Sequence, residues 1–212
     1  MTTSLIAQAT YQAIQCSIFK NETCLATATI PKQLASKNLV TTILQLLAQH
    51  TLNFSDLDFI GANLGPAPFT TLRVLIATLN GIAFAKQIPL IGVDGLKAFM
   101  HEVSTPTWPQ TVILLNAYQH DVYFAYQEKT GYTSIESLLV KLTIKIPHNG
   151  VRFIGDGAQQ HVQLITQTFG ERAYIDQDAP PFVSLKSIAH EALQLWNKHE
   201  TCPQLLPLYL KN

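Results

Sequence analysis

The sequence predicts an α/β protein of two lobes, each built on a mixed β-sheet flanked by helices. Three short apolar runs joined by tight turns open the chain, which is typical of an antiparallel meander. Strand and helix patterns then alternate to about residue 103. After a segment rich in Pro, Ser and Thr at 104–109, a shorter second half shows similar patterns, which indicates a second and smaller lobe.

Local patterns place the individual elements. In the first half we expect strands at 4–9, 13–19, 24–30, 59–64 and 89–93, and helices at 36–49, 70–85 and 95–103. In the second half we expect strands at 111–116, 122–127 and 151–154, and helices at 134–142, 159–169 and 184–199. We assign residues 1–103 to the first lobe, joined by the helix at 184–199. The second lobe then comprises 104–183 and the tail 200–212.

The helix expected at 70–85 is unusual because it is apolar on both sides. One side forms a stripe for the core, made of Leu72, Leu75, Ile76, Leu79, Ile82 and Ala83. The opposite side carries Val74, Ala77, Gly81 and Phe84, where a surface helix normally has charges. Either this is the central helix of a large domain, or another subunit covers its outer side. Thr70 or Thr71 is expected to cap its N-terminus.

The helix expected at 36–49 supports the second interpretation. Its core stripe is predicted to be Leu39, Val40, Ile43, Leu44 and Leu47. Its other face, with Thr41, Thr42, Gln45 and Gln49, is polar but uncharged, which favours a protein contact.

The composition also favours a permanent partner, because charged residues make up 13% of the chain, about half the usual share. The net charge is zero and the basic residues are scattered, so we expect no strong direct binding of tRNA or other nucleic acid. No apolar stretch is long enough to cross a membrane. The three cysteines show no CxxC spacing and are expected to be reduced thiols of a cytoplasmic protein.

Three motifs resemble a known family. They are the loop and helix start Gly65-Pro66-Ala67-Pro68-Phe69-Thr70-Thr71-Leu72-Arg73, the segment Asn116-Ala117-Tyr118 before Asp121-Val122-Tyr123, and the ending Pro207-Leu208-Tyr209-Leu210-Lys211. They resemble TsaB (YeaZ-type) proteins, the non-catalytic partners in bacterial synthesis of threonylcarbamoyladenosine in tRNA, within the superfamily of TsaD. The order of elements matches over nearly the whole chain, and the resemblance implies a two-lobed actin-like ATPase fold. Departures at Ala67, Pro68, Thr71, Asn116 and Tyr118 make it a divergent copy.

The resemblance implies a non-catalytic subunit that binds and activates a TsaD-like catalytic partner, with a TsaE-like ATPase as a further candidate partner. It implies no cofactor for this chain alone. Whether ATP or ADP binds at the partner interface stays open, and Gly65 and Arg73 are the candidate contacts for such a nucleotide. We expect a homodimer when the chain is alone, and the face formed by the helices at 36–49 and 70–85 is the candidate surface for it, while whether the homodimer and the heterodimer share one surface stays open. The predicted contact residues are Thr41, Gln45, Phe69, Thr70, Arg73, Val74, Ala77, Thr78, Gly81, Phe84 and Tyr209.

The residues that actin-like and metal-dependent enzymes need are not found at the expected spacing. Gln8 stands where an actin-like phosphotransferase has an aspartate, and a neutral amide supplies no charge to a metal. Pro66 and Pro68 in the loop have no N–H for a phosphate. No two histidines are spaced as HxxxH, and no GxSxG occurs. A small-molecule kinase of the actin-like superfamily and a homodimeric scaffold without the tRNA role remain as alternatives.

Overall fold

The computed structural model describes residues 1–210, and the chain divides into two compact units. The first unit contains residues 1–95 and 184–208, and the second contains 96–183 and the chain from Tyr209. This division differs from the predicted one in two places. Residues 96–103 belong to the second unit, where the carbonyl of Val103 accepts a hydrogen bond from Arg152. Residues 200–208 belong to the first, because Leu205 lies in its core. Lys211 and Asn212, part of the predicted tail, lie outside the described residues.

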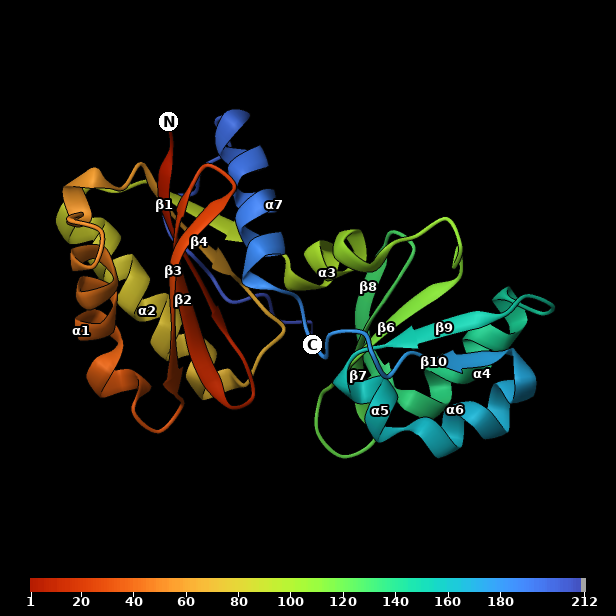
Figure 1. Ribbon diagram of the computed structural model, residues 1–212. Helices are drawn as coiled ribbons and strands as arrows, with labels where there is room; N and C mark the ends of the chain where they lie inside the picture. The colour runs from red at the N-terminus through yellow and green to blue at the C-terminus, as the bar shows by residue number, and fades with distance from the viewer. Residues whose placement is uncertain (211–212) are drawn as a thin grey trace. The chain divides into compact units, whose positions relative to one another are not determined.

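The first unit is built on a five-stranded mixed sheet in the order β3-β2-β1-β4-β5 (Figure 1). The antiparallel part is the predicted meander of β1 (Thr3–Ala9), β2 (Ala13–Lys20) and β3 (Thr23–Pro31). The parallel part adds β4 (Phe59–Asn63) and β5 (Leu90–Val93) on the other side of β1. These parallel strands need crossover connections, and helices supply them.

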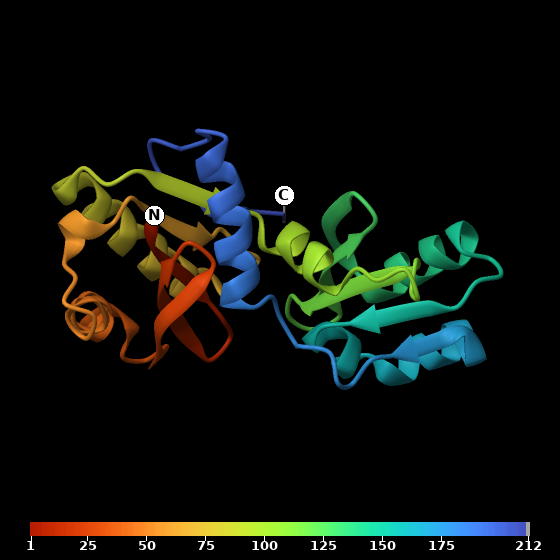
Figure 2. The same ribbon diagram turned by 45° about the horizontal axis from the view of Figure 1, so that its top comes forward.

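Helices cover both faces of this sheet (Figures 1 and 2). On one face lie α1 (Ala35–Ala48) and α2 (Phe69–Lys86), which pack beside each other. On the opposite face lies α7 (Leu185–Asn197), which contacts β4 and β5. The approach of α7 is close at Gly61, where an added Cβ would stand 3.0 Å from the Cβ of Ala192. The short helix η1 (Phe54–Asp56) precedes β4.

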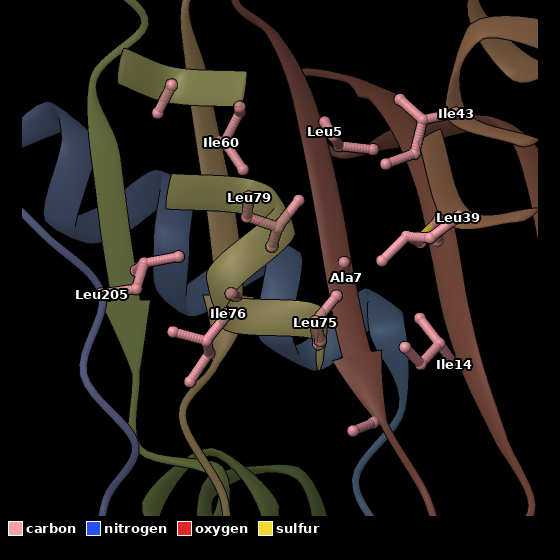
Figure 3. Close-up of a cluster of buried hydrophobic side chains, with 14 of the residues drawn as sticks. Leu5, Ala7, Ile14, Leu39, Ile43, Ile60, Leu75, Ile76, Leu79 and Leu205 are labelled. Atoms are coloured by element: carbon pink, nitrogen blue, oxygen red, sulfur yellow. The ribbon is translucent and has the colours of Figure 1, made fainter. Parts of the chain in front are cut away.

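The core of the first unit lies between the sheet and the pair α1 and α2 (Figure 3). Leu5 and Ala7 of β1 point into it, and Leu39 and Ile43 of α1 meet them. From α2 come the buried side chains Leu72, Leu75, Ile76, Leu79 and Ala83, so the predicted inner stripe is confirmed apart from Ile82, which is half-buried.

The second unit repeats the topology of the first, with a sheet in the order β10-β9-β6-β7-β8. Its antiparallel strands are β6 (Thr111–Asn116), β7 (Asp121–Tyr126) and β8 (Lys129–Ser134), and its parallel strands are β9 (Val151–Ile154) and β10 (Ala173–Ile175). The helices are α3 (Gly95–Val103), α4 (Ile135–Lys145), α5 (Asp156–Gln160) and α6 (Val162–Phe169), with η2 (Gly170–Arg172) after α6. Side chains of α4 and α6 form the core with this sheet.

Two predictions about helix boundaries and caps are wrong, and the strands β8 and β10 are missing from the prediction. The helix expected at 159–169 is divided into α5 and α6, and His161 stands between them with a non-helical backbone. The threonine cap of α2 does not form, because the helix begins one residue earlier, at Phe69, with Pro68 at the cap position and no side-chain hydrogen bond. The carbonyl of Pro68 instead accepts the first helical bond, from the N–H of Leu72 at 2.9 Å.

The segment that follows α7 is tied to α2 by one side chain. The Nδ2 of Asn80 donates to the carbonyl of Leu205 at 3.0 Å, and the N–H of Leu205 donates to the Oδ1 of Asn80 at 2.9 Å. Leu205 is 1% exposed, so water does not readily replace these bonds. The N–H of Leu208 also donates to the carbonyl of Leu64 at 2.8 Å.

Asn80→Ala is therefore expected to destabilise the first unit by about 3 kcal/mol, because it leaves a buried peptide N–H and C=O without partners. Urea unfolding measures the loss, and hydrogen exchange should locate faster exchange in residues 200–208. Gln45→Ala, which removes an exposed amide from α1, is the matched control and should leave both unchanged. Equal stability of Asn80→Ala and the parent protein would contradict this account of the tail.

Candidate functional site

The outer sides of α1 and α2 form one surface, which we call the α1–α2 face. On α2 the exposed residues of this face include Ala77, Gly81 and Phe84, and Phe84 is 82% exposed. A Cβ added to Gly81 would meet no atom within 4 Å, so the surface at this point is open. The outer side of α2 is therefore apolar and uncovered by the described residues of this chain. This excludes the interpretation of α2 as a central helix buried on both sides.

The middle of α2 is flatter than its ends. Val74 is half-buried and packs against the core, and Thr78 is half-buried with its hydroxyl donating to the carbonyl of Val74 at 2.8 Å. Only Ala77 projects from this turn, and its side chain is a single methyl group. Small residues let the backbone of another protein approach closely.

The N-terminal end of the face carries its most prominent cation. The guanidinium of Arg73 lies 3.8 Å from the ring centroid of Phe69, which is 55% exposed. Stacking on the ring holds the guanidinium against the helix surface and restricts the motion of the arginine side chain. Thr70 is exposed in the same turn. The guanidinium of Arg73 can donate hydrogen bonds to a carboxylate or a phosphate of another molecule.

The C-terminal end of the face opens into a groove of about 710 Å³. Gly81, Phe84 and Gln87 line it from α2, and Thr201 and Gln204 line it from the segment after α7. The groove gives α2 a recess beside Phe84, its most exposed large apolar side chain.

On α1 the predicted stripe is wrong at two positions. The buried residues are Ala35, Leu39, Ile43, Leu46 and Leu47. Val40 and Leu44 are 44% and 46% exposed, and they join the exposed Thr41 and Gln45 on the outer side. The face is thus more apolar than the sequence analysis predicts. A helical wheel with Leu46 in the core stripe in place of Leu44 would have predicted that Val40 and Leu44 are exposed. Residues 39, 43, 46 and 47 lie on one side of the helix as well as the predicted stripe does.

The structure therefore brings ten of the predicted contact residues together on α1 and α2 and leaves one apart. The ten are Thr41, Gln45, Phe69, Thr70, Arg73, Val74, Ala77, Thr78, Gly81 and Phe84. Tyr209 belongs to the second unit and is 51% exposed.

A cluster of buried amides lies where β1 and β4 end. Gln8 is 1% exposed, and its Nε2 donates to Gln15 while its Oε1 accepts from Asn63 at 3.4 Å. Asn63 accepts the N–H of Gly65 at 2.8 Å. Gly65 (φ 118°) precedes a cis bond to Pro66, and its carbonyl accepts from the N–H of Gly95. The loop N–H that is the candidate nucleotide contact is thus already bonded to a protein side chain.

In the second unit, two acidic side chains lie near strand ends: Asp121 begins β7, and Asp156 follows β9. Asp156 accepts the N–H of Asn116 at 3.0 Å. Burial raises the pKa of Asp156, although backbone N–H groups, Asn116 first, partly offset this. Asp121 accepts the hydroxyl of Tyr132 on the neighbouring strand, so it has a structural bond there.

Other reactive groups do not form a site. Burial raises the pKa of the Cys16 thiol to about 12, so this cysteine is unreactive at neutral pH. Among residues 1–210, no three His, Cys, Asp or Glu side chains converge so that they could hold a metal ion. None of the helices in this described part of the chain has the length and apolarity to span a bilayer.

Comparison with known proteins agrees with this architecture. A crystal structure described as an uncharacterized protein with similarity to peptidase YeaZ from Pseudomonas aeruginosa covers 100% of both chains with a TM-score of 0.77 at 21% identity. This likeness confirms the predicted two-lobed actin-like fold.

Relatives in sequence match shorter stretches. An uncharacterized protein of Mycobacterium tuberculosis is 31% identical over 97 residues, which is 46% of this chain and 44% of the relative. The tRNA threonylcarbamoyladenosine biosynthesis protein TsaB of Buchnera aphidicola is 25% identical over 111 residues, 51% of this chain and 50% of the relative. The chain spans between about a quarter and a half of the length of the curated relatives that it matches.

The family model described as TsaD, tRNA N6-adenosine threonylcarbamoyltransferase, matches residues 29–197, which is most of the chain and extends over parts of both units. The chain therefore belongs to the TsaD family, and within it the chain is a TsaB-like member.

Proposed function

We propose that this protein is a non-catalytic subunit required for threonylcarbamoyl transfer to adenosine in tRNA, and that it acts by binding and activating a TsaD-like catalytic partner. The observation that carries the proposal is the exposed, nearly uncharged α1–α2 face. Phe84 at 82% exposed is costly to leave in water, and covering it with a partner removes that cost. Family membership supplies the chemical class of the reaction.

The distribution of charge supports a protein partner rather than RNA on this face. Arg73 is the sole charged residue of α2 before Lys86, and α1 carries only Lys37. Binding of RNA through phosphates needs several cations along one surface. In this proposal, tRNA is held by other components of the complex, which act in the cytoplasm. A TsaE-like ATPase is a further candidate member.

The amide cluster supports a non-catalytic role. Gln8 occupies the strand end where an actin-like phosphotransferase places a carboxylate for its metal, and its amide is bonded to Gln15 and Asn63. A neutral, hydrogen-bonded amide contributes little to the binding of Mg²⁺ and cannot act as a general base. We therefore expect no cofactor on the isolated chain. In this proposal, Arg73 at the edge of the face is the candidate contact for ATP or ADP held by the partner.

Depleting this protein in its own organism is expected to remove most of the threonylcarbamoyl modification from adenosine in tRNA. Mass spectrometry of total tRNA nucleosides measures it, and a plasmid copy of the gene should restore the level. Other modified nucleosides in the same samples are the internal control. An unchanged level of threonylcarbamoyladenosine would overturn the assignment to this reaction and favour a scaffold role.

A further inference from the structure

The second unit contains a cavity of about 180 Å³ that plays no part in the proposed function. Three segments line it: α3, the segment 104–111 that follows α3, and the hairpin of β7 and β8 (Figure 1). All of its lining residues belong to this one compact unit, so a single fold forms the cavity. A water molecule needs only about 10–15 Å³ of such volume, so the cavity has room for a small organic molecule.

The inner wall of the cavity is largely apolar and is held in place. Ala125 of β7 is buried there, and Met100 of α3 and Trp108 are half-buried. The indole of Trp108 stacks on Tyr174, with ring centroids 4.8 Å apart and planes 4° from parallel. The carbonyl of Trp108 also accepts the hydroxyl of Thr111 at 2.8 Å. A ligand therefore meets a preformed apolar wall and does not have to order it, which favours binding.

The rim of the cavity carries charges of both signs. Lys97 and His101 stand four residues apart on α3, so their side chains lie on one side of the helix, along the cavity. Both are exposed, and both side chains can donate hydrogen bonds to an anion. The turn between β7 and β8 contributes the exposed carboxylate of Glu128. Donors for an anion and an acceptor for a cation thus surround one apolar wall, which suits a small zwitterion.

We propose that this cavity binds a small α-amino acid with an apolar side chain. The carboxylate of the ligand accepts hydrogen bonds from Lys97 and His101, and its ammonium group donates to Glu128. Its side chain packs against Met100 and Trp108. A phosphate is disfavoured because Glu128 repels it, and a simple amine leaves Lys97 without an anion. The proposal does not depend on the proposed function, because the cavity shares no residue with the α1–α2 face.

The two tryptophans of the chain provide the readout for a binding test. Trp108 lines the cavity, whereas Trp196 belongs to the first unit and stacks on Phe59. In NMR spectra of the full chain, L-valine should shift the indole N–H resonance of Trp108 in a saturable way and leave that of Trp196 unchanged. The variant Trp196→Phe assigns the two resonances.

Analogues of valine that lack one charge test the zwitterion. Isovalerate has no ammonium group and isobutylamine has no carboxylate, so each should bind at least about tenfold more weakly than L-valine. The proposal would be overturned if about 50 mM L-valine left the Trp108 resonance in place, since this concentration detects millimolar dissociation constants. Equal binding of isovalerate and L-valine would also overturn it.

Substitutions on the rim test which side chains hold the ligand. Lys97→Met and Glu128→Gln should each raise the dissociation constant for L-valine about tenfold, because each removes one counter-charge and keeps most of the side chain's volume. Lys141→Met, which removes an exposed lysine of α4 outside the cavity, is the matched control and should bind L-valine like the parent protein. Unfolding midpoints should be the same in all three variants. Binding that neither rim substitution weakens, or that Lys141→Met weakens equally, would refute the site.

Discussion

Ala77→Arg is expected to abolish co-purification of this protein with its TsaD-like partner. Ala77 is exposed in the middle of the apolar side of α2, between the half-buried Val74 and the open position Gly81. In the proposed complex a partner helix covers this methyl group. An arginine there must either hold the two surfaces apart or be buried without a counter-ion. Either outcome costs about 4 kcal/mol or more, which is about a thousandfold in affinity.

The substitution should not affect the fold, because the new side chain projects into solvent in the free protein. Circular dichroism and the unfolding midpoint of Ala77→Arg should therefore match those of the parent protein. Gln167→Arg, which introduces the same charge at an exposed site on α6 in the second unit, is the control and should co-purify normally. Survival of the complex with Ala77→Arg would show that the partner binds elsewhere. The threonylcarbamoyladenosine level in cells carrying each variant should follow the binding result.

The apolar outer side of α2 could be predicted from the sequence because it rests on composition. Ala77, Gly81 and Phe84 are uncharged whichever way the helix is turned. The apolar stripe from Leu72 to Ala83 must face the core, so these three residues are placed on the outer side. The orientation of α1 about its own axis could not be predicted in this way. Its apolar residues are so frequent that stripes through Leu44 or through Leu46 fit equally, and only packing against β2 and β3 decides between them.

Contacts between segments that are far apart in the chain could not be predicted from the sequence either. Nothing local indicates that Asn80 binds the backbone of Leu205, 125 residues further along the chain. The edge position of β3 likewise follows from strand order, because the sequence of a meander does not say which outer strand the parallel part joins. The amide cluster was not predicted: Gln8 was singled out because it stands where an actin-like phosphotransferase has an aspartate, and its bond to Asn63 depends on the pairing of β1 with β4.

Arg152→Met is expected to destabilise the second unit by about 3–5 kcal/mol. The Nε and Nη2 of Arg152 donate to the Oδ2 of Asp176 at 2.9 and 2.6 Å, and both side chains are 12% exposed. Its Nη1 also donates to the carbonyl of Val103 at 3.0 Å, which ties the end of α3 to β9. Methionine keeps much of the volume but leaves the Asp176 carboxylate and this carbonyl without their donor. Urea unfolding at neutral pH measures the loss.

The pH dependence of this loss identifies its cause. Burial alone would raise the pKa of Asp176, but the hydrogen bonds and charge of Arg152, with the N–H groups of Ala179 and Asp178, outweigh it, so the pKa is lowered. A carboxyl group with a lowered pKa stabilises the fold above its unfolded pKa, about 3.9, and this contribution disappears as the pH falls through the folded pKa. Without Arg152 only the two N–H groups offset the burial, so the difference in stability between the parent protein and Arg152→Met should shrink as the pH falls below about 4.

Arg172→Met separates the ion pair from the loss of an arginine in general. Arg172 lies in the same unit and donates to the carbonyls of Ile146 and Pro147, with no carboxylate among these partners. Its replacement should cost about 1–2 kcal/mol, by the same amount at neutral and acidic pH, because backbone carbonyls do not titrate. If both variants lost stability with the same pH dependence, the contribution of Asp176 would be excluded. A difference that shrinks in acid only for Arg152→Met requires the titrating partner to be the carboxylate that follows β10.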